Sequence, residues 1–443
     1  NQINYLRANL TPERNHRTLE LYSLFVASLT LPNLDKNGDL LKFSIEKLYE
    51  NLVSDIQADG VHCEQSTHYH LIVLRSFLGV MENARKFDLQ LPNDFTERVE
   101  KACEFAMHIH RPDGEIPALS DSDTGSYLDL IELAGEIFNC QDFLFIGTKG
   151  EKGTPPNEKN IGFETGGYYI QRSDWTTEAK FLVFDCGRLG DGGHGHYDLL
   201  NVEISANGKL LIVDTGRFTY SEEGATNWRH FFKGTAAHNT VCVDEKDQIT
   251  YRRGKPKGEI SRGRLIERLN FENLDILCGE VISPNYDTIH TRRIFFIHND
   301  YWLIWDNLRG ETARKFDLRF HLTPEAWNHI LVEQNQDNSI VSTQDLSLVF
   351  PKGENINIEP SWYAPEYGIK HRIPCVSVVS EGVANKDFFT LVKPLQNHEK
   401  PPILQILDNK IEVVGETFRD ILSYELVGEN LQIQEFQCSE VTK

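Results

Sequence analysis

The sequence has no apolar run that could cross a membrane, because none approaches the roughly 18 residues that a spanning helix needs. Its N-terminal stretch, NQINYLRANL, lacks a Met, a basic segment and an apolar segment, so it contains no readable signal peptide. The eight cysteines include no CxxC pair and no small-domain framework, which favours buried thiols. The chain also lacks internal repeats and low-complexity tracts, as is typical of globular domains.

Positive charge is scarce as well, since 45 Lys and Arg residues stand against 66 Asp and Glu residues and the formal net charge is −21. A general nucleic-acid binder needs a basic surface to release counterions, so nucleic acid is excluded as a partner. An acidic ligand in a local basic cleft stays compatible with this charge, because basic residues cluster at 252–257 and at Arg229–His230.

The first 150 residues have the pattern of helices, in a 443-residue chain that is long enough for two or three domains. Apolar residues recur there at helical spacing, with Pro32, Pro92 and Pro112 at the joins. The helical segments are Arg17 to Leu29, Ser44 to Ile56, Tyr69 to Phe87, Asp94 to Ile109 and Tyr127 to Phe138. Helices of this size with short loops predict antiparallel hairpins that stack as a bundle or a partial toroid.

The pattern changes after a polar linker at residues 147–160 (GTKGEKGTPPNEKN). Beyond it apolar residues alternate with period two and helical signals are nearly absent, which predicts a large antiparallel β-sandwich. The expected strands are Gly167–Gln171, Lys180–Asp185, Asn201–Ser205, Leu210–Asp214, Thr240–Val243, Arg292–Ile297, Tyr301–Trp305, Phe316–His321 and Ile403–Leu407. We therefore predict a multidomain α+β chain: a helical domain over 1–150, a β-sandwich over 151–385 and a small β region over 386–443.

One hairpin can be read in detail, because Asn207-Gly208 is a type I′ turn signal between NVEIS and LLIVD. Pairing about this turn sets Ile204 against Leu211. The same register places Asp214 opposite Asn201.

The stretch Asp191–Ser205 (DGGHGHYDLLNVEIS) is the richest in candidate chemistry. His194, His196 and Asp198 alternate in it, and alternate side chains of an extended strand share a face. Imidazole and carboxylate groups bind borderline cations such as zinc, and imidazole also transfers protons near neutral pH.

A zinc site would need partners from elsewhere in the chain. His196, Asp214 and His238 form a two-His, one-carboxylate set of a type suited to zinc. In a straight hairpin His196 lies too far from Asp214, so this set requires the glycines at 192, 193 and 195 to curl the chain back. Each of the three residues, taken singly, is better explained as a hydrogen-bonded core or turn residue.

Two polar segments stand out in the helical half. Asn15 and His16 open a helix, where Asn15 is also explained as an N-cap. Glu64 to His70 (EQSTHYH) is dense in titratable groups before an apolar run, although its Tyr69 is also explained as an ordinary half-buried aromatic residue. Together with the His-rich segment, they predict a polar cleft between the two halves of the chain.

Six blocks of the sequence carry a resemblance to a known family. They are RNHRTLE (Arg14 to Glu20), DGVHCEQSTHYHLIVL (Asp59 to Leu74), RPDGEIPALSDSD (Arg111 to Asp123), GGHGHYD (Gly192 to Asp198), LLIVDTG (Leu210 to Gly216) and NWRHFFKGTAAHNTVCVD (Asn227 to Asp244). In order and spacing they resemble the heparinase II/III-like polysaccharide lyases, a family that pairs an α/α toroid with a β-sandwich.

This resemblance implies an enzyme that cleaves an acidic polysaccharide containing uronic acid (a glycosaminoglycan, an alginate-like polymer or a bacterial capsular or exopolysaccharide) by β-elimination. Such chemistry needs donors that neutralise the uronate carboxylate and groups that move protons. The implied catalytic residues are Asn15 and His16 at the carboxylate, Tyr69 as acid and candidate base, and His194. The implied substrate contacts are Glu64, Gln65, Arg229 and His230, with Trp228 and Tyr251 as weaker candidates.

The resemblance also implies one structural zinc ion per chain. Its ligands would be His196, Asp214 and His238, which requires the curled segment described above. Asp198 is then left as a supporting or structural group.

The chain departs from the family in having few residues before Asn15, where family members carry many helical residues. Either an N-terminal part is missing from this chain, which leaves the toroid incomplete, or the protein is a shortened member with an open cleft. The charge of −21 favours a less sulfated uronan over a heparin-like polyanion.

Two other functions stay open: a non-catalytic protein that binds acidic polysaccharide, and a metal-dependent glycan hydrolase with the His and Asp set as its reaction centre. By resemblance we expect a bacterial periplasmic or secreted protein without a membrane span, with an oligomer left open.

Overall fold

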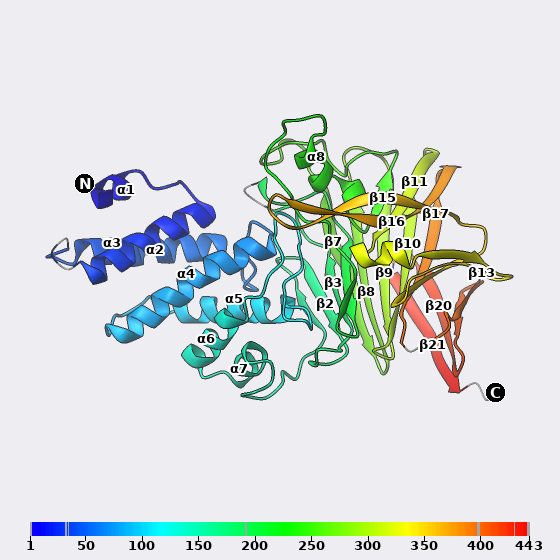
Figure 1. Ribbon diagram of the computed structural model, residues 1–443, viewed down its shortest axis with the longest axis horizontal. Helices are drawn as coiled ribbons and strands as arrows, with labels where there is room; N and C mark the ends of the chain where they lie inside the picture. The colour runs from blue at the N-terminus through cyan, green and yellow to red at the C-terminus, as the bar shows by residue number, and fades with distance from the viewer. Residues whose placement is uncertain are drawn as a thin grey trace.

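The computed structural model describes residues 2–31, 33, 35–190, 193–396, 399–428 and 430–440. Pro32, Asp191 and Gly192, which the sequence places at a joint and in the His-rich segment, lie outside these residues. A helical region and a β-rich body form the two ends of an elongated molecule, and the first and last elements, α1 and β21, lie at opposite ends (Figure 1). The predicted α+β class and its order along the chain are confirmed.

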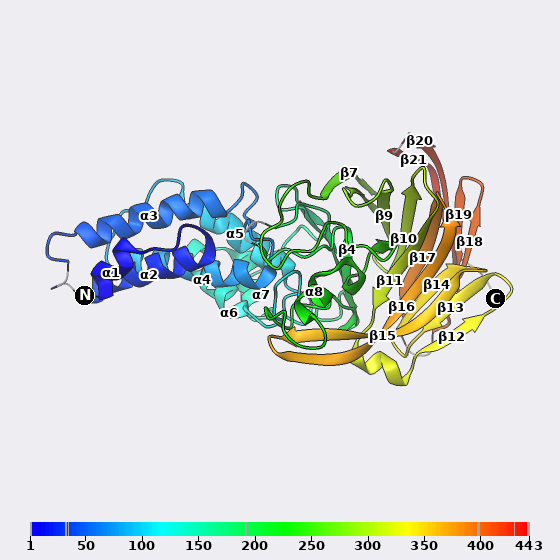
Figure 2. The ribbon, with the colours of Figure 1, turned by 90° about the horizontal axis from the view of Figure 1, so that it is seen from above.

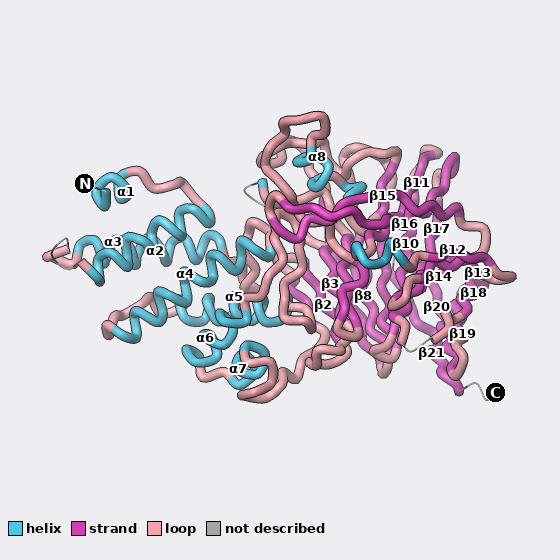
Figure 3. Tube along the Cα trace, viewed as in Figure 1, coloured by secondary structure: helices cyan, strands magenta, loops and turns pink. Residues whose placement is uncertain are grey.

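The helical region contains all five predicted helices and two short ones that the periodicity missed. Their bounds are α1 Gln2–Ala8, α2 Arg14–Thr30, α3 Asp39–Asp55, α4 Thr67–Lys86, α5 Phe95–Ile109, α6 Leu128–Phe138 and α7 Gln141–Gly147. Helices α1 and α7 have seven residues each, too few for an apolar repeat to show. Helices α2 and α3 pack against each other, as do α4 and α5, and α6 and α7 (Figure 3).

Helix α4 illustrates how the sequence positions the site. The Ser66 hydroxyl accepts a hydrogen bond from the Tyr69 amide, as an N-cap does, and donates one to the Asp121 carbonyl oxygen. The buried face of the helix repeats at intervals of three and four residues, for example at Leu71, Leu74 and Leu78. The cap therefore fixes the start of α4 against the loop that contains Asp121, with Tyr69 in the first turn.

The β-rich body consists of antiparallel sheets, and Figure 2 shows the C-terminal one, β18 to β21, toward the end of the molecule opposite the helices. The first sheet runs in chain order through β1 Ile161–Phe163, β2 Tyr168–Arg172, β3 Phe181–Asp185, β4 Asn201–Ala206 and β5 Lys209–Ile212. An eight-stranded sheet has the order β12 Leu331–Gln334, β13 Asn338–Ser342, β14 Leu346–Pro351, β17 Lys386–Pro394, β10 Tyr301–Arg309, β9 Ile289–Ile297, β8 Leu274–Ile282 and β7 Arg262–Phe271.

Two four-stranded sheets complete this body. One has the order β15 Asn355–Glu366, β16 Ile369–Val383, β11 Arg314–His321 and β6 Val241–Val243. The other contains β18 Ile403–Leu407, β19 Lys410–Val414, β20 Phe418–Val427 and β21 Asn430–Glu440. Helix α8, Trp228–Lys233, lies among the strands in the chain, in a segment for which the sequence predicted no helix.

The first sheet lies between the helices and the remaining sheets. Alternate residues of β2, such as Tyr168 and Ile170, share a hydrophobic core with α4 and α5, where the ring of Phe105 meets that of Tyr168. The opposite face, with Tyr169 and Phe184, packs into the core of the β-rich body. Because one sheet belongs to both cores, the helical and β-rich regions meet at a fixed, packed interface.

Two details of the strands differ from the prediction. Asn207 and Gly208 have the positive φ of a type I′ turn, but a bulge after Ile204 pairs it with Ile212 instead of Leu211. Strand β17 pairs with β10 and β14 in the eight-stranded sheet, so the separate C-terminal sheet begins at Ile403, later than the predicted start at 386. Within the described ranges, no helix combines the length and apolarity that a membrane crossing requires.

Candidate active site

On the helical side, Asn15 in α2 and Glu64 in the loop before α4 form a buried pair. The Asn15 amide nitrogen Nδ2 donates to Glu64 Oε2 at 2.7 Å. Burial raises the pKa of the Glu64 carboxyl, against the opposing influence of His194 and of the hydrogen bond from Asn15. Because the carboxyl oxygen accepts from Nδ2, this bond fixes the orientation of the Asn15 amide.

On the β-rich side, the segment Gly193–Gly195, called the glycine segment below, turns the chain back toward the helices. Gly193 has a φ of 93°, and a Cβ on Gly195 would lie 2.5 Å from the backbone nitrogen of Gly190. A side chain at 195 would collide with that backbone, and the conformation at 193 is one that other residues rarely adopt. The backbone therefore turns at Gly193 and Gly195, two of the three glycines at which the curl was predicted; the third, Gly192, lies outside the described residues.

This curl brings His194 against Tyr69. Their rings stack with centroids 4.0 Å apart and planes 30° apart, and His194 Nε2 lies 3.6 Å from Glu64 Oε1. Residues from α2, α4 and the glycine segment thus meet where the helical and β-rich regions join. Asn15, Tyr69 and His194, which the sequence proposed as a set, are in one place.

Asp121 organises the buried side of this cluster. Its Oδ2 lies 2.9 Å from His194 Nδ1, and its Oδ1 lies 2.9 Å from His196 Nε2. The Arg229 guanidinium bonds to both of its oxygens. Burial opposes ionisation, but the histidine hydrogen bonds and the Arg229 charge hold the pKa of Asp121 well below its usual range. As an ionised acceptor, Asp121 takes a hydrogen bond from His194 Nδ1, so Nε2 is the nitrogen left toward Glu64 and the cluster.

Tyr220 and Arg217 also contact Tyr69, and neither was assigned a role from the sequence. The Tyr69 and Tyr220 hydroxyls are 2.9 Å apart, and Arg217 Nη1 lies 2.9 Å from the Tyr220 oxygen and 3.4 Å from the Tyr69 oxygen. Asp123 holds the Arg217 guanidinium with both carboxylate oxygens, at 2.6 and 2.8 Å. A fixed positive charge therefore lies beside the Tyr69 phenol.

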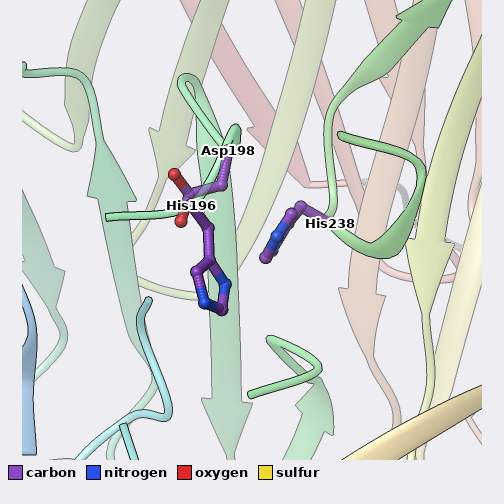
Figure 4. Close-up of side chains that lie close together, drawn as sticks. All are labelled: His196, Asp198 and His238. Atoms are coloured by element: carbon purple, nitrogen blue, oxygen red, sulfur yellow. The ribbon is translucent and has the colours of Figure 1, made fainter. Parts of the chain in front are cut away.

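Behind this cluster lies a buried group of metal-ligand type. His196, Asp198 and His238 each offer one ligand atom within 4.8 Å of the others, and Figure 4 shows the two imidazole rings close to the carboxylate. This set differs from the predicted one in its carboxylate. Asp214 instead accepts hydrogen bonds from His238 Nδ1 at 2.9 Å and from Asn201 Nδ2 at 2.6 Å.

The protonation pattern of this group fits a divalent cation. Asp121 fixes the proton of His196 on Nε2, and Asp214 fixes that of His238 on Nδ1, so each ring has one nitrogen lone pair left. Those nitrogens, His196 Nδ1 and His238 Nε2, are buried without a hydrogen-bond partner, as is Asp198 Oδ2. Burial lowers the pKa of His196 to about 4, which keeps its imidazole in the neutral, ligating form. Burial acts in the same direction on His238, but the charge and hydrogen bond of Asp214 raise the pKa of that ring, so a cation would have to displace a proton there. Three unpartnered buried atoms of the right types are what a bound ion would satisfy.

Two family profiles match successive parts of the chain. The chain matches the family profile described as "Heparinase II/III-like, C-terminal" over residues 155–400 and the one described as "Heparinase II/III N-terminus" over residues 1–141. The chain belongs to the heparinase II/III family.

Characterised members of this heparinase II/III family are distant in sequence. A heparin-sulfate lyase of Bacteroides stercoris is 23% identical over 410 residues, which cover 88% of this chain and 58% of that protein. One of Pedobacter heparinus is 24% identical over 404 residues, covering 89% and 58%. The solved heparinase III encoded by BT4657 superposes with a TM-score of 0.82 at 21% identity, over 99% of this chain and 68% of the other. The chain thus shares their fold and spans little more than half the length of the curated relatives.

Other residues predicted for this heparinase II/III site have different surroundings. His16 is exposed on α2 and, among the described residues, takes part in none of the contacts above. Arg229, predicted as a substrate contact, is only 1% exposed and is committed to Asp121, so it positions the histidines instead. Gln65 is also buried, and its backbone oxygen accepts a bond from Tyr168. Distant loops contribute Asp121, Asp123, Arg217 and Tyr220. The two aspartates lie in one of the sequence blocks that carry the family resemblance, but none of the four was assigned a role from the sequence.

His230 keeps an exposed position, in which its ring stacks on Tyr251 and its Nε2 lies 2.8 Å from Asp247 Oδ2. The hydrogen bond to Asp247 raises the pKa of His230 above 6.5. The charged pair therefore stabilises the fold below that pH, and the stabilisation is lost as pH rises through the folded-state pKa.

We expect His230→Gln to lower the unfolding free energy by less than about 1 kcal/mol at about pH 5.5 and by less still at about pH 8.5. Urea denaturation at both pH values measures this, and an equal loss at both would contradict it.

Proposed function

We propose that this chain is a polysaccharide lyase that cleaves a polymer containing uronic acid by β-elimination. The observation that carries the proposal is the convergence of Asn15, Tyr69 and His194 from three separate segments, with Tyr69 stacked on His194. Its family relatives with matching sequence and fold are named heparin-sulfate lyases and heparinase III. The substrate class is therefore an acidic glycosaminoglycan or a related uronan, and the net charge of −21 favours weak sulfation.

The first requirement of this reaction is a donor at the uronate carboxylate. Removing the proton on C5 builds negative charge beside that carboxylate, so a preorganised donor lowers the barrier. Glu64 holds the Asn15 amide in one orientation, which suits Asn15 to this role. Glu64 thus acts by positioning Asn15, and His16 is not required for the step.

The second requirement is proton transfer, for which Tyr69 and His194 are the pair. The C5–H and C4–O bonds break and a C4–C5 double bond forms. The pair of Tyr69 and His194 accepts the proton from C5, and the Tyr69 phenol donates a proton to the leaving oxygen. No water is consumed. The Arg217 charge near the phenol oxygen favours negative charge that develops there, while the hydrogen bond to Asp121 leaves His194 Nε2 toward the cluster.

We further propose that His196, Asp198 and His238 hold one zinc ion in a structural role. When bound, the ion cross-links the residues that follow the glycine segment to the segment before β6, and it supplies no reacting group. The ligand residues are at most 2% exposed, so the ion lies out of reach of a polysaccharide. This burial disfavours the alternative of a metal-dependent hydrolase.

The test is to follow the ultraviolet absorbance of the conjugated, unsaturated uronate that β-elimination creates, over a panel of uronan polysaccharides. We expect a rise with at least one polymer and a rate at least about 100-fold lower for Tyr69→Phe, which keeps the ring but removes the proton. The matched control is Tyr49→Phe, a tyrosine of α3 that bonds Asp94 away from the site, and its rate should equal that of the unmodified chain.

Other outcomes identify the alternatives. New reducing ends without ultraviolet absorbance would contradict the lyase and indicate hydrolysis. Binding of a polymer without any cleavage would indicate the non-catalytic protein. We also propose that the helical hairpins are part of an α/α toroid and that the protein works in the bacterial periplasm or outside the cell, where polymeric substrates occur.

A further inference from the structure

A cavity lies between the helical region and the first sheet, away from the residues of the proposed catalytic cluster. Its volume is about 330 Å³, within the range of small-ligand pockets. Its walls come from the segment after α5, from α6 and α7, and from the loop between β2 and β3. None of the residues of the proposed catalytic cluster lines it.

Arg172, at the end of β2, is the residue of this cavity whose surroundings indicate a bound ligand. Its side chain is 2% exposed, and its guanidinium lies 4.3 Å from the ring centre of Trp175 and 4.8 Å from that of Phe181. Within the described part of the chain it bonds only to carbonyl oxygens, those of His108 and His110, and its Nε has no partner. A buried cation without a carboxylate is costly, and a bound anion would offset that cost.

Arg111, another buried arginine in the same cavity wall, is paired with carboxylates, unlike Arg172. Arg111 bonds to Asp113, Glu115 and Glu203, each at 3.0 Å at its nearest. No ion pair of this kind forms to Arg172 from any described carboxylate. Asp174 and Asp113 act on Arg172 only through space, so its guanidinium keeps positive charge for a ligand.

Other groups around Arg172 complete a site for an anion that carries a ring. The indole nitrogen of Trp175 is buried without a partner, and Lys149 brings a second positive charge to the rim. Thr176 and Thr177 line the same cavity, and so do the apolar side chains of Leu128 and Phe145. Cationic, hydroxyl and apolar surfaces in one pocket match a sugar ring that bears a carboxylate.

We propose that this cavity is a second, non-catalytic site that binds a uronate residue, with its carboxylate toward Arg172 and Trp175. The choice of a uronate rests on the proposed function, because a uronan chain is the acidic sugar that this protein would meet. A second hold on the polymer would keep it on the enzyme between cleavage events.

The test uses the full chain labelled with 5-fluorotryptophan and D-glucuronate as the probe. The sequence has six Trp residues, and the ¹⁹F resonance of Trp175 is assigned by its disappearance in Trp175→Phe. We expect glucuronate to shift this resonance in a saturable way and glucose, which lacks the carboxylate, to leave it in place. A Trp175 resonance that ignores glucuronate, or that responds equally to glucose, would overturn the proposal.

Two matched variants locate the binding without disturbing the buried arginine. Lys149→Glu reverses the rim charge and should raise the dissociation constant of glucuronate roughly fivefold or more. Lys152→Glu makes the same change at an exposed lysine that pairs with Glu132 and does not line the cavity, so its dissociation constant should be that of the unmodified chain. Equal dissociation constants for the two variants would contradict the site.

The fate of this site is separable from that of the lyase. In His194→Ala the Trp175 response to glucuronate should persist although cleavage is lost, because the cavity and the catalytic cluster share no residue. A response in a chain that cleaves no polymer would sustain the cavity and contradict the lyase. Cleavage of a polymer without any response of the Trp175 resonance would support the lyase and contradict the cavity site.

Discussion

The Asp121→Asn variant is expected to lose about 10⁴-fold in kcat and about 3 to 5 kcal/mol in unfolding free energy. The amide keeps the shape of the carboxylate but removes the charge and one acceptor. His194 and His196 would then lose the acceptor that fixes their protons, and Arg229, which is 1% exposed, would be left as an uncompensated buried charge. Initial rates of unsaturated-uronate formation and urea denaturation measure the two losses.

Asp123→Asn is the matched control, since it makes the same chemical change two residues further on. Asp123 bonds Arg217 on the more exposed side, so we expect losses of about tenfold in rate and about 1 kcal/mol in stability. The double variant Asp121→Asn, His194→Ala should be no slower than the worse single variant, because the two residues act as one unit. If Asp121→Asn kept a rate within tenfold of the unmodified chain, the proposed role of Asp121 would be wrong.

The helices and the central hairpin could be predicted because their signals are local. The apolar repeat of α4 and the Asn207-Gly208 turn are each written within a few residues. Strands such as β8 and β10 were missed or shortened because they are buried on both faces, which removes the alternation on which the prediction depends.

The catalytic cluster could be predicted only in part. Asn15, Tyr69 and His194 stood in dense polar segments, and the glycines on both sides of His194 indicated a turn of the backbone. Asp121 also stood in one of the quoted blocks, but neither it nor Tyr220 could be given a role, because an aspartate or tyrosine in a loop is ordinary and its partners lie far along the chain. The His194–Asp121 contact spans 73 residues and the Tyr69–Tyr220 contact spans 151.

The choice of metal ligand shows the same limit. The family resemblance implied Asp214 as the carboxylate ligand, against the register of a straight hairpin. Asp214 does reach His238, but it contacts Nδ1 of that ring and the backbone amide of Gly216. Asp198 reaches the group because the chain leaves extended geometry before β4, which sequence alternation does not reveal. A carboxylate that binds a ligand and one that orients it look alike in a sequence.

Removing the metal should test this ligand set most directly. We expect about one zinc ion per purified chain, and chelation should lower the unfolding free energy by about 4 kcal/mol, as for an ion present at roughly 1,000 times its dissociation constant. Asp198→Asn should abolish stoichiometric zinc binding, because it removes a ligand. Asp214→Asn should weaken affinity by about 10- to 100-fold yet retain the ion at saturating zinc, because it only loosens the hold on His238. Metal analysis of both variants at matched zinc concentrations decides between them. Retention by Asp198→Asn with loss by Asp214→Asn would instead establish the set His196, Asp214 and His238.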